Sequence, residues 1–330
     1  VMEINPQEAQ IYEAVKASAE AALNGLDGVV SVSIVLTGHT ETAPPDLRPN
    51  KPAEPKGPQK IPGVDRILAI ASGKGGVGKS TTAANLALAL VAEGARVGVL
   101  DADIYGPSQP LMMGLVGERP LSEDGKTLIP PTAHGIQVMS IGFLVDPDQP
   151  MAWRGPMVTS ALNQLLGQTA WDDLDYLIVD MPPGTGDIQL TLSQRVPVSG
   201  AVIVTTPQDI ALLDARKGLQ MFRKVSVPVL GVIENMSTHV CSECGHEEAI
   251  FGEGGGALMA TDYEVTLLGQ MPLDLSIREQ TDSGTPTVVA APDSQQAAAY
   301  RSTALRMVAA LAARGRDYSA RFPKIVVEDN

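Results

Sequence analysis

The chain has 330 residues, of which 44% are apolar and 4% aromatic, so it is long and apolar enough to bury one large core. Its 24 basic residues against 38 acidic ones give a formal charge of −14, which argues against nucleic acid or an anionic membrane as a partner. The two cysteines exclude a disulfide-rich secreted scaffold, and neither a signal peptide nor an apolar run of about 18 residues is found, so we expect a cytoplasmic protein.

The first 37 residues predict a partial α+β module. In residues 6–23 apolar side chains recur every three to four positions, which predicts a helix. In residues 28–36 they alternate with small or polar ones, which predicts a half-buried strand. About forty residues are marginal as an independent domain. Because the chain begins at Val1, we expect this module to be the latter part of a small domain.

Residues 38–63 contain seven prolines, which predicts an extended, semi-rigid linker. From residue 64 to residue 330 apolar strands alternate with helices, and this pattern predicts an α/β fold with a mainly parallel sheet covered by helices on both faces. The strands are expected at residues 66–72, 96–101, 136–141, 176–180, 201–206 and 229–235, and the longer helices at 80–93, 157–168, 210–224 and 295–314.

The loop after the first of these strands, SGKGGVGKST at residues 72–81, matches the phosphate-binding pattern G-x-x-x-x-G-K-S/T. Its backbone N–H groups and the following helix N-terminus are suited to phosphate oxygens. We expect Lys79 to reach the β- and γ-phosphates and the Ser80 hydroxyl to bind Mg²⁺. A tight strand–helix turn is the alternative, but it rarely needs four glycines followed by Lys-Ser. The residues expected to contact the nucleotide are Gly73, Lys74, Gly75, Gly76, Val77, Gly78, Lys79, Ser80 and Thr81.

Two further strand ends carry carboxylates. Asp101 and Asp103, in VLDADIYGPS, follow one strand; one of them is expected to hold a magnesium-bound water and the other to orient the attacking water. Alternatively, Asp101 only caps the next segment. Asp180, in LIVDMPPGTGD, ends a hydrophobic strand in the Walker B arrangement, whose carboxylate reaches Mg²⁺. These elements predict a P-loop NTPase with Ser80, Asp101, Asp103 and Asp180 around magnesium.

Both cysteines lie in the stretch HVCSECGHEE, as Cys241 and Cys244, a spacing that lets two thiolates face one ion. A tetrahedral zinc or an iron–sulfur cluster normally has four protein ligands. His239 or His246 could complete a zinc site, whereas a redox dithiol or a buried structural pair fits the polar surroundings poorly. If the chain dimerises about a two-fold axis, two pairs supply four thiolates, which suits a 4Fe–4S cluster.

The loop GKGGVGKS resembles the deviant phosphate-binding loop of the MinD/ParA group of dimeric ATPases. The resemblance implies that Lys74 acts in trans on the partner's nucleotide, although a solvated surface lysine is the simpler interpretation of the spacing alone. It also implies ATP, because Asn235 in VIENMS and Pro272 in GQMPLD correspond to adenine-contacting positions. By the same matching Asp214 helps to place water, and a helix-surface carboxylate is the equally weighted alternative. The implied catalytic set is Lys74, Lys79, Asp103, Asp180 and Asp214.

Five segments in order, GKGGVGKS, DADIYGPS, DMPPGTGD, ENMS and CSECGHEEAIFGEGGG, resemble the Mrp/ApbC family of iron–sulfur cluster carrier ATPases over about residues 62–318. The resemblance implies a homodimer that bridges a 4Fe–4S cluster at the Cys-x-x-Cys. It also implies slow ATP hydrolysis coupled to cluster transfer, with apo iron–sulfur proteins and a cluster donor as partners.

Two alternatives stay open. A MinD/ParA-like regulatory ATPase with a structural zinc would share the same loop. Such a regulator needs a membrane-seeking tail or a basic DNA-binding face, and the end of this acidic chain, residues 321–330, is short and carries as many acidic as basic side chains. A cluster-bearing electron-transfer ATPase is the other alternative, and its cysteines lie far apart in sequence.

Overall fold

A computed structural model describes two compact units, which divide between Lys56 and Gly57. The predicted linker, for the most part, and everything after residue 314 lie outside the described residues. No helix in the described part is long and apolar enough to cross a membrane. The structure describes residues 2–3, 9–26, 29, 31–37, 60–122, 124–144 and 155–314.

The N-terminal unit contains helix α1 (Ala9–Asn24) and the strands β1 (Met2–Glu3) and β2 (Leu36–Thr37), which pair in parallel. The helix agrees with the one predicted from the periodicity. The strand predicted at residues 28–36 is wrong for most of its length, because residues 31–35 lie outside any strand.

Side chains of α1, not a neighbouring strand, satisfy part of the backbone in this segment. The Val32 amide donates to Asn24 Oδ1 (2.8 Å) and the Ile34 amide to Glu20 Oε1 (2.7 Å). Val32 and Ile34 are also less exposed than the residues between and after them. The alternation therefore indicated which side chains are less exposed, but it could not indicate whether a pairing strand exists.

The second unit is built on a sheet that, among the described residues, has eight strands in the order β12-β9-β8-β3-β7-β4-β6-β5. Neighbouring strands are parallel except for the edge pair β5 and β6. All six predicted strands are present, and β5 and β12 were not predicted. The strands are β3 (Val64–Ser72), β4 (Val97–Asp101), β5 (Thr132–Ala133), β6 (Ile136–Ser140), β7 (Leu174–Asp180), β8 (Gly200–Thr205), β9 (Val229–Glu234) and β12 (Thr266–Gln270).

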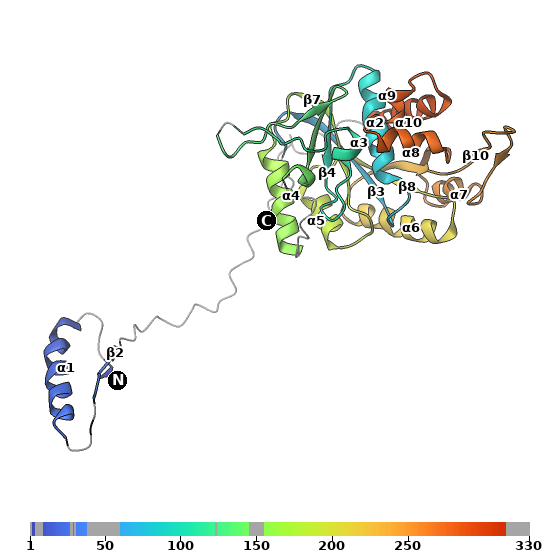
Figure 1. Cartoon of the computed structure of the whole chain (residues 1–330). Helices are drawn as coiled ribbons and strands as arrows, with labels where there is room; N and C mark the ends of the chain where they lie inside the picture. Colours follow the sequence, from blue (N-terminus) through green and yellow to red (C-terminus); the bar gives the residue numbers. More distant parts are fainter. Residues whose placement is uncertain are drawn as a thin grey trace, which may run out of the picture. The chain divides into compact units, whose positions relative to one another are not determined.

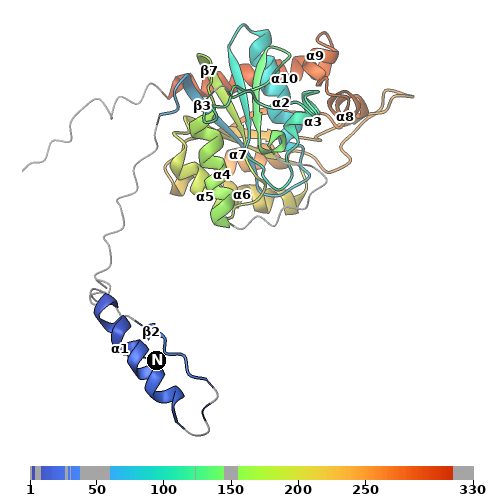
Figure 2. The same cartoon turned by 60° about the vertical axis from the view of Figure 1, so that its left-hand side comes forward.

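Helices cover both faces of this sheet, as Figures 1 and 2 show. The four longer helices of this unit confirm the predicted ones, α2, α4, α6 and α10. One layer contains α2 (Lys79–Ala92), α8 (Leu275–Asp282), α9 (Thr287–Ala290) and α10 (Gln295–Ala313). The other contains α4 (Gly155–Gln168), α5 (Asp187–Arg195), α6 (Asp209–Lys224) and α7 (Gly255–Asp262), and the short helix α3 (Gln109–Met112) follows β4.

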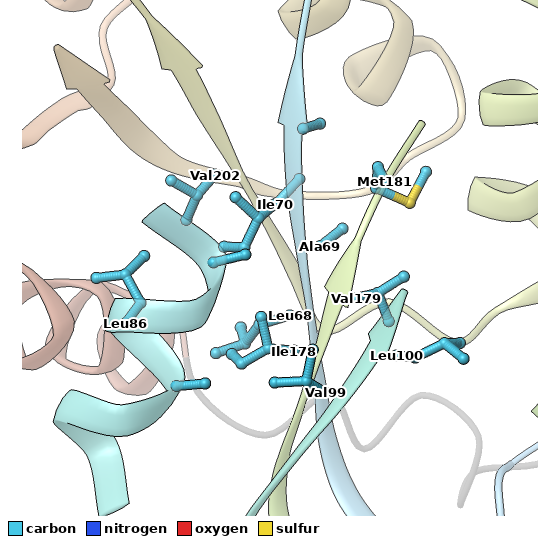
Figure 3. Close-up of a cluster of buried hydrophobic side chains, with 14 of the residues drawn as sticks. Leu68, Ala69, Ile70, Leu86, Val99, Leu100, Ile178, Val179, Met181 and Val202 are labelled. Atoms are coloured by element: carbon cyan, nitrogen blue, oxygen red, sulfur yellow. The ribbon is translucent and has the colours of Figure 1, made fainter. Parts of the chain in front are cut away.

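The central strands are buried on both faces, and their packing positions two carboxylates. Leu68, Ile70 and Ile178 have no exposed surface, and Figure 3 shows them among the side chains between the sheet and α2. The parallel register pairs Asp101 of β4 with Asp180 of β7. The apolar core therefore brings both carboxylates to the carboxyl edge of the sheet, where parallel α/β sheets bind ligands.

Candidate functional site

The phosphate loop joins β3 to α2 through positions that only glycine fits. Gly78 has a φ of 78°, and a Cβ there would clash with the Asn235 side chain. A Cβ at Gly73 would clash with the backbone of Asp214 on α6. The loop is therefore held closely between the end of β9 and helix α6.

A hollow of about 250 Å³ lies at this loop, on the carboxyl edge of the sheet. It brings together most of the loop residues predicted to contact nucleotide, with Asp103 and with Pro183 of the PPGTGD segment. Gly73 and Val77 do not line it. The lining residues are Ser72, Lys74, Gly75, Gly76, Gly78, Lys79, Ser80, Thr81, Asp103, Gly106, Ser108, Met112 and Pro183.

A buried ion pair lies beneath the hollow. Lys79 Nζ contacts Asp180 Oδ1 and lies 3.1 Å from Ser80 Oγ, and the side chains of Lys79 and Asp180 are 6% and 0% exposed. The other oxygen, Asp180 Oδ2, accepts from Gln109 Nε2 at 2.9 Å. Sequence reasoning missed Gln109, whose one available signal was its place directly after the DADIYGPS segment.

Asp101 and Asp103 have different surroundings. Asp101 is fully buried, does not line the hollow, and accepts from the backbone amides of Ser108 (2.9 Å) and Gln109 (3.0 Å). These contacts fit the alternative in which it caps the next segment. Burial, together with the negative charge of Asp180, raises the pKa of Asp101 to about 7. Asp103 faces the hollow, and burial raises its pKa too.

The donors at this edge fit magnesium. Ser80 Oγ and the Asp180 carboxylate gather around one cationic nitrogen, that of Lys79, and Asp103 lines the same hollow. These are the hard oxygen donors that Mg²⁺ binds, usually through one or two carboxylates together with phosphates of the substrate. Ser80, Asp103 and Asp180 could therefore hold such an ion, and Asp101 is the buried register partner of Asp180.

The residues expected at the base lie at neighbouring strand ends but do not line the hollow. Asn235 Nδ2 donates to the Val77 carbonyl at 2.8 Å, which ties the end of β9 to the phosphate loop. Pro272 follows Met271, whose amide donates to the Glu234 carbonyl at 2.8 Å. Asn235 and Pro272 thus follow the adjacent strands β9 and β12.

Asp214 points elsewhere. Its carboxylate pairs with Lys217 on the same helix at 2.9 Å and does not line the hollow. That contact fits the interpretation of Asp214 as a helix-surface carboxylate, and its water-placing role stays a prediction. Lys74 does line the hollow and is half-buried.

The cysteines lie on a hairpin made of β10 (His239–Val240) and β11 (Glu247–Glu248), which projects from the sheet in Figure 1. The Cys241 amide donates to the His246 carbonyl, and the Gly245 amide donates to the Cys241 carbonyl, both at 2.9 Å. Hydrogen bonds from Cys244 and from the backbone of Glu243 lower the pKa of the Cys241 thiol. The local fold thus favours the thiolate, the form that binds metal.

The described residues place no further metal ligand beside this pair. In the part of the chain that the structure describes, no group of three or more His, Cys, Asp or Glu side chains could hold a metal ion. His239 Nδ1 lies 3.0 Å from the Leu273 carbonyl oxygen, and Cys244 is exposed. A mononuclear zinc site completed by His239 or His246 is therefore not formed among the described residues.

Known proteins resemble this chain over most of its length. A family model described as ParA, NUBPL iron-transfer P-loop NTPase, matches residues 63–308. The iron-sulfur cluster carrier protein of Pseudomonas fragi is 59% identical over 294 residues, which are 87% of this chain and 97% of that protein. The carrier protein of Escherichia coli K12 is 62% identical over 76% of this chain and 68% of its own length. The mouse iron-sulfur cluster transfer protein NUBPL is 54% identical over 75% and 78%.

Solved structures share the fold of the second unit. A nucleotide-binding protein of Archaeoglobus fulgidus, in complex with ADP, has a TM-score of 0.60 and 38% identity over 67% of this chain and 87% of that one. The cell division ATPase MinD of Pyrococcus furiosus has a TM-score of 0.55 and 25% identity over 74% and 98%. The predicted P-loop NTPase fold, a mostly parallel sheet between helices, is confirmed.

Proposed function

Because the chain belongs to the ParA/NUBPL family of iron-transfer P-loop NTPases, we propose that it is an iron–sulfur cluster carrier that hydrolyses ATP. One observation carries the proposal: a phosphate-loop hollow and a partly exposed cysteine pair, which supplies two ligands, occur in the same unit. The first is suited to a nucleotide, and the second is suited to cargo that further ligands must help to hold.

The nucleotide site would work by moving a buried charge. Phosphate oxygens in the hollow attract Lys79 Nζ away from Asp180, because they offer several negative charges where Asp180 offers one. Ser80, Asp103 and Asp180 would then hold Mg²⁺, which neutralises charge on the phosphates. Asp103, at the lining of the hollow, would orient the water that attacks the γ-phosphate, and Asn235 and Pro272 would contact the adenine.

A homodimer would complete both sites. Lys74 lines the hollow and would reach the nucleotide of the facing protomer, as an arginine finger does. Two copies of Cys241 and Cys244 supply four thiolates, the set that a 4Fe–4S cluster takes. ATP hydrolysis would change how well the dimer holds this cargo, and that differential affinity is what makes ATP useful for delivery to apo-proteins.

The decisive experiment is anaerobic reconstitution of the full chain with iron and sulfide, followed by metal analysis and native mass measurement. About two irons and two sulfides per protomer in a dimer would support one bridging 4Fe–4S cluster. About half a zinc ion per protomer with no cluster taken up would overturn the carrier proposal. The cysteines would then be a structural staple in a regulatory ATPase.

A further inference from the structure

Gln109 connects three segments of the nucleotide site. It is the first residue of α3 and has no exposed surface. Its side-chain Nε2 donates to Asp180 Oδ2 (2.9 Å) and to the Ser80 carbonyl (3.1 Å), and its backbone amide donates to Asp101 Oδ2 (3.0 Å). Because both partners of Nε2 are acceptors, the orientation of the amide group follows from its contacts.

The two oxygens of Asp180 have different kinds of partner. Oδ1 contacts the charged Lys79 Nζ, whereas Oδ2 accepts from the neutral amide of Gln109. When phosphates attract the lysine, Oδ1 loses a cation, but Oδ2 keeps its donor. A neutral donor holds the carboxylate in place without cancelling its charge, so that charge stays available to a metal ion.

The geometry points to Gln109 as a positioning residue for magnesium: it fixes Asp180 relative to Ser80 so that Oδ1 and the Ser80 hydroxyl face the same ion. This inference rests on the nucleotide-binding part of the proposed function. A second observation supports it. Gln109 Oε1 is buried and has no hydrogen-bond partner among the described residues. A magnesium-bound water is a donor of the kind that this buried acceptor needs.

Gln109→Met tests the inference, because methionine keeps the length and shape of glutamine and removes both donors. The full-length protein would be loaded with ADP, and Mg²⁺ would be titrated by calorimetry, with Mn²⁺ paramagnetic resonance as a second readout. We expect ADP affinity in EDTA to change less than about two-fold, since Gln109 does not line the hollow and its side chain contacts the loop only at the Ser80 carbonyl, which is not a donor to phosphate. We expect the Kd for Mg²⁺ to rise about ten-fold or more, the usual effect of losing a partner of a metal ligand.

Asn85→Leu is the matched control. Asn85 is an equally buried amide on α2, and it donates to the Thr81 carbonyl (3.0 Å) and accepts from the Val288 amide (3.1 Å), away from Asp180. It should lower thermal stability while leaving the Kd for Mg²⁺ unchanged.

Three outcomes of this titration would count against the inference. An unchanged Kd for Mg²⁺ in Gln109→Met overturns it, and so does an equal rise in Asn85→Leu. A wild-type protein that binds no ADP would overturn the nucleotide part of the proposed function as well, so the two failures are distinguishable.

Discussion

Lys79 and Asp180 lie under the phosphate loop with almost no exposed surface, whereas Cys244 lies exposed on a projecting hairpin. At the sheet edge, buried charges have partners within the chain: Lys79 contacts one oxygen of Asp180, and Gln109 Nε2 donates to the other. On the hairpin, the structure describes two thiols and no third ligand. One site is arranged by the fold of a single chain, whereas the described residues supply two thiols and no third ligand to the other.

This difference suits two ligands that are handled differently. A nucleotide that stays with the protein through a reaction benefits from donors fixed in advance. A cluster that must leave benefits from a site that is open to solvent and shared with another chain. If the two sites are separate in this sense, each can be disabled while the other still binds its ligand.

Cys241→Ser should have the largest effect, a complete loss of reconstituted cluster. Serine keeps the hairpin hydrogen bonds of the backbone but removes one of the two thiolates that a protomer supplies. ADP affinity should stay within about two-fold, because the hairpin does not line the hollow. Iron content and ADP titration measure both. Ser242→Ala, between the cysteines, is the control and should retain the full cluster; equal iron in Cys241→Ser would contradict the assignment of this site.

Lys79→Ala should disable the nucleotide site and leave the cysteine site able to bind a cluster. Loss of the ammonium group removes the proposed phosphate contact and leaves Asp180 buried without its cation. We expect ATP hydrolysis to fall by about 100-fold or more, while the cluster assembles normally and transfers poorly. Phosphate release and a cluster-transfer assay provide the measurements.

Lys224→Ala, an exposed lysine at the end of α6, is the control for this charge loss and should hydrolyse ATP at the wild-type rate. Unchanged cluster transfer in Lys79→Ala would show that transfer does not depend on the nucleotide site.

The carboxyl edge of the sheet, where the phosphate loop lies, was largely predictable because its sequence motifs are local. Continuous apolar strands, the glycine-rich loop and the strand-terminal Asp180 each occupy a few consecutive residues, and a parallel sheet brings such strand ends together. The contact between Gln109 and Asp180 was not predictable, since 71 residues separate them and no motif joins them. For the same reason, the sequence could not show that Asp103 faces the hollow while Asp101 is buried behind it.

The cysteine spacing likewise predicted two ligands but not their surroundings. The hairpin depends on the Pro272 segment, where the Leu273 amide donates to the Thr238 carbonyl at 2.7 Å. Strand β12, which leads into that segment, is five residues long and includes Gly269, so it had no clear periodic signal. At residues 28–36 the opposite error arose, since alternation was present without a pairing strand.

Gly78→Ala should have a smaller effect, which is confined to the nucleotide site. The residue has a φ of 78°, and its new Cβ would meet the Asn235 side chain, so the loop must shift. We expect about a ten-fold loss of ADP affinity, a destabilisation of about 1–3 kcal/mol and no change in reconstituted iron. Calorimetry, thermal unfolding and iron analysis measure these effects.

Gly167→Ala on α4 serves as its control, because open space surrounds the position and alanine favours a helix by about 1 kcal/mol. Loss of cluster in Gly78→Ala would show that the phosphate loop and the hairpin are coupled already in the absence of nucleotide.

Asp274→Ala should have the smallest effect. It changes stability near the cysteine hairpin without removing a ligand from either site. Asp274 caps α8 and accepts from the Ser276 amide (2.8 Å) and from Gln296 Nε2 (2.6 Å). Burial raises its pKa, but the hydrogen bonds from Ser276 and Gln296 outweigh burial and leave the pKa below its usual value. Loss of the cap should cost about 1 kcal/mol at pH 7, a fall of about 2–4 °C in Tm.

The pH dependence of this loss follows from the sign of the pKa shift. A carboxylate with a lowered pKa in the folded state stabilises the protein above the unfolded pKa of about 4, and that stabilisation disappears as the pH falls through the folded value. The Tm difference between wild type and Asp274→Ala should therefore be present at pH 7 and shrink below pH ~4. An equal difference at both pH values would mean that packing, not the charged cap, is lost. Asp274 follows the segment that holds the hairpin, but it contributes no ligand. Unchanged iron content and ADP binding in Asp274→Ala would therefore show that the cluster site depends on its thiols and not on the stability of the fold around it.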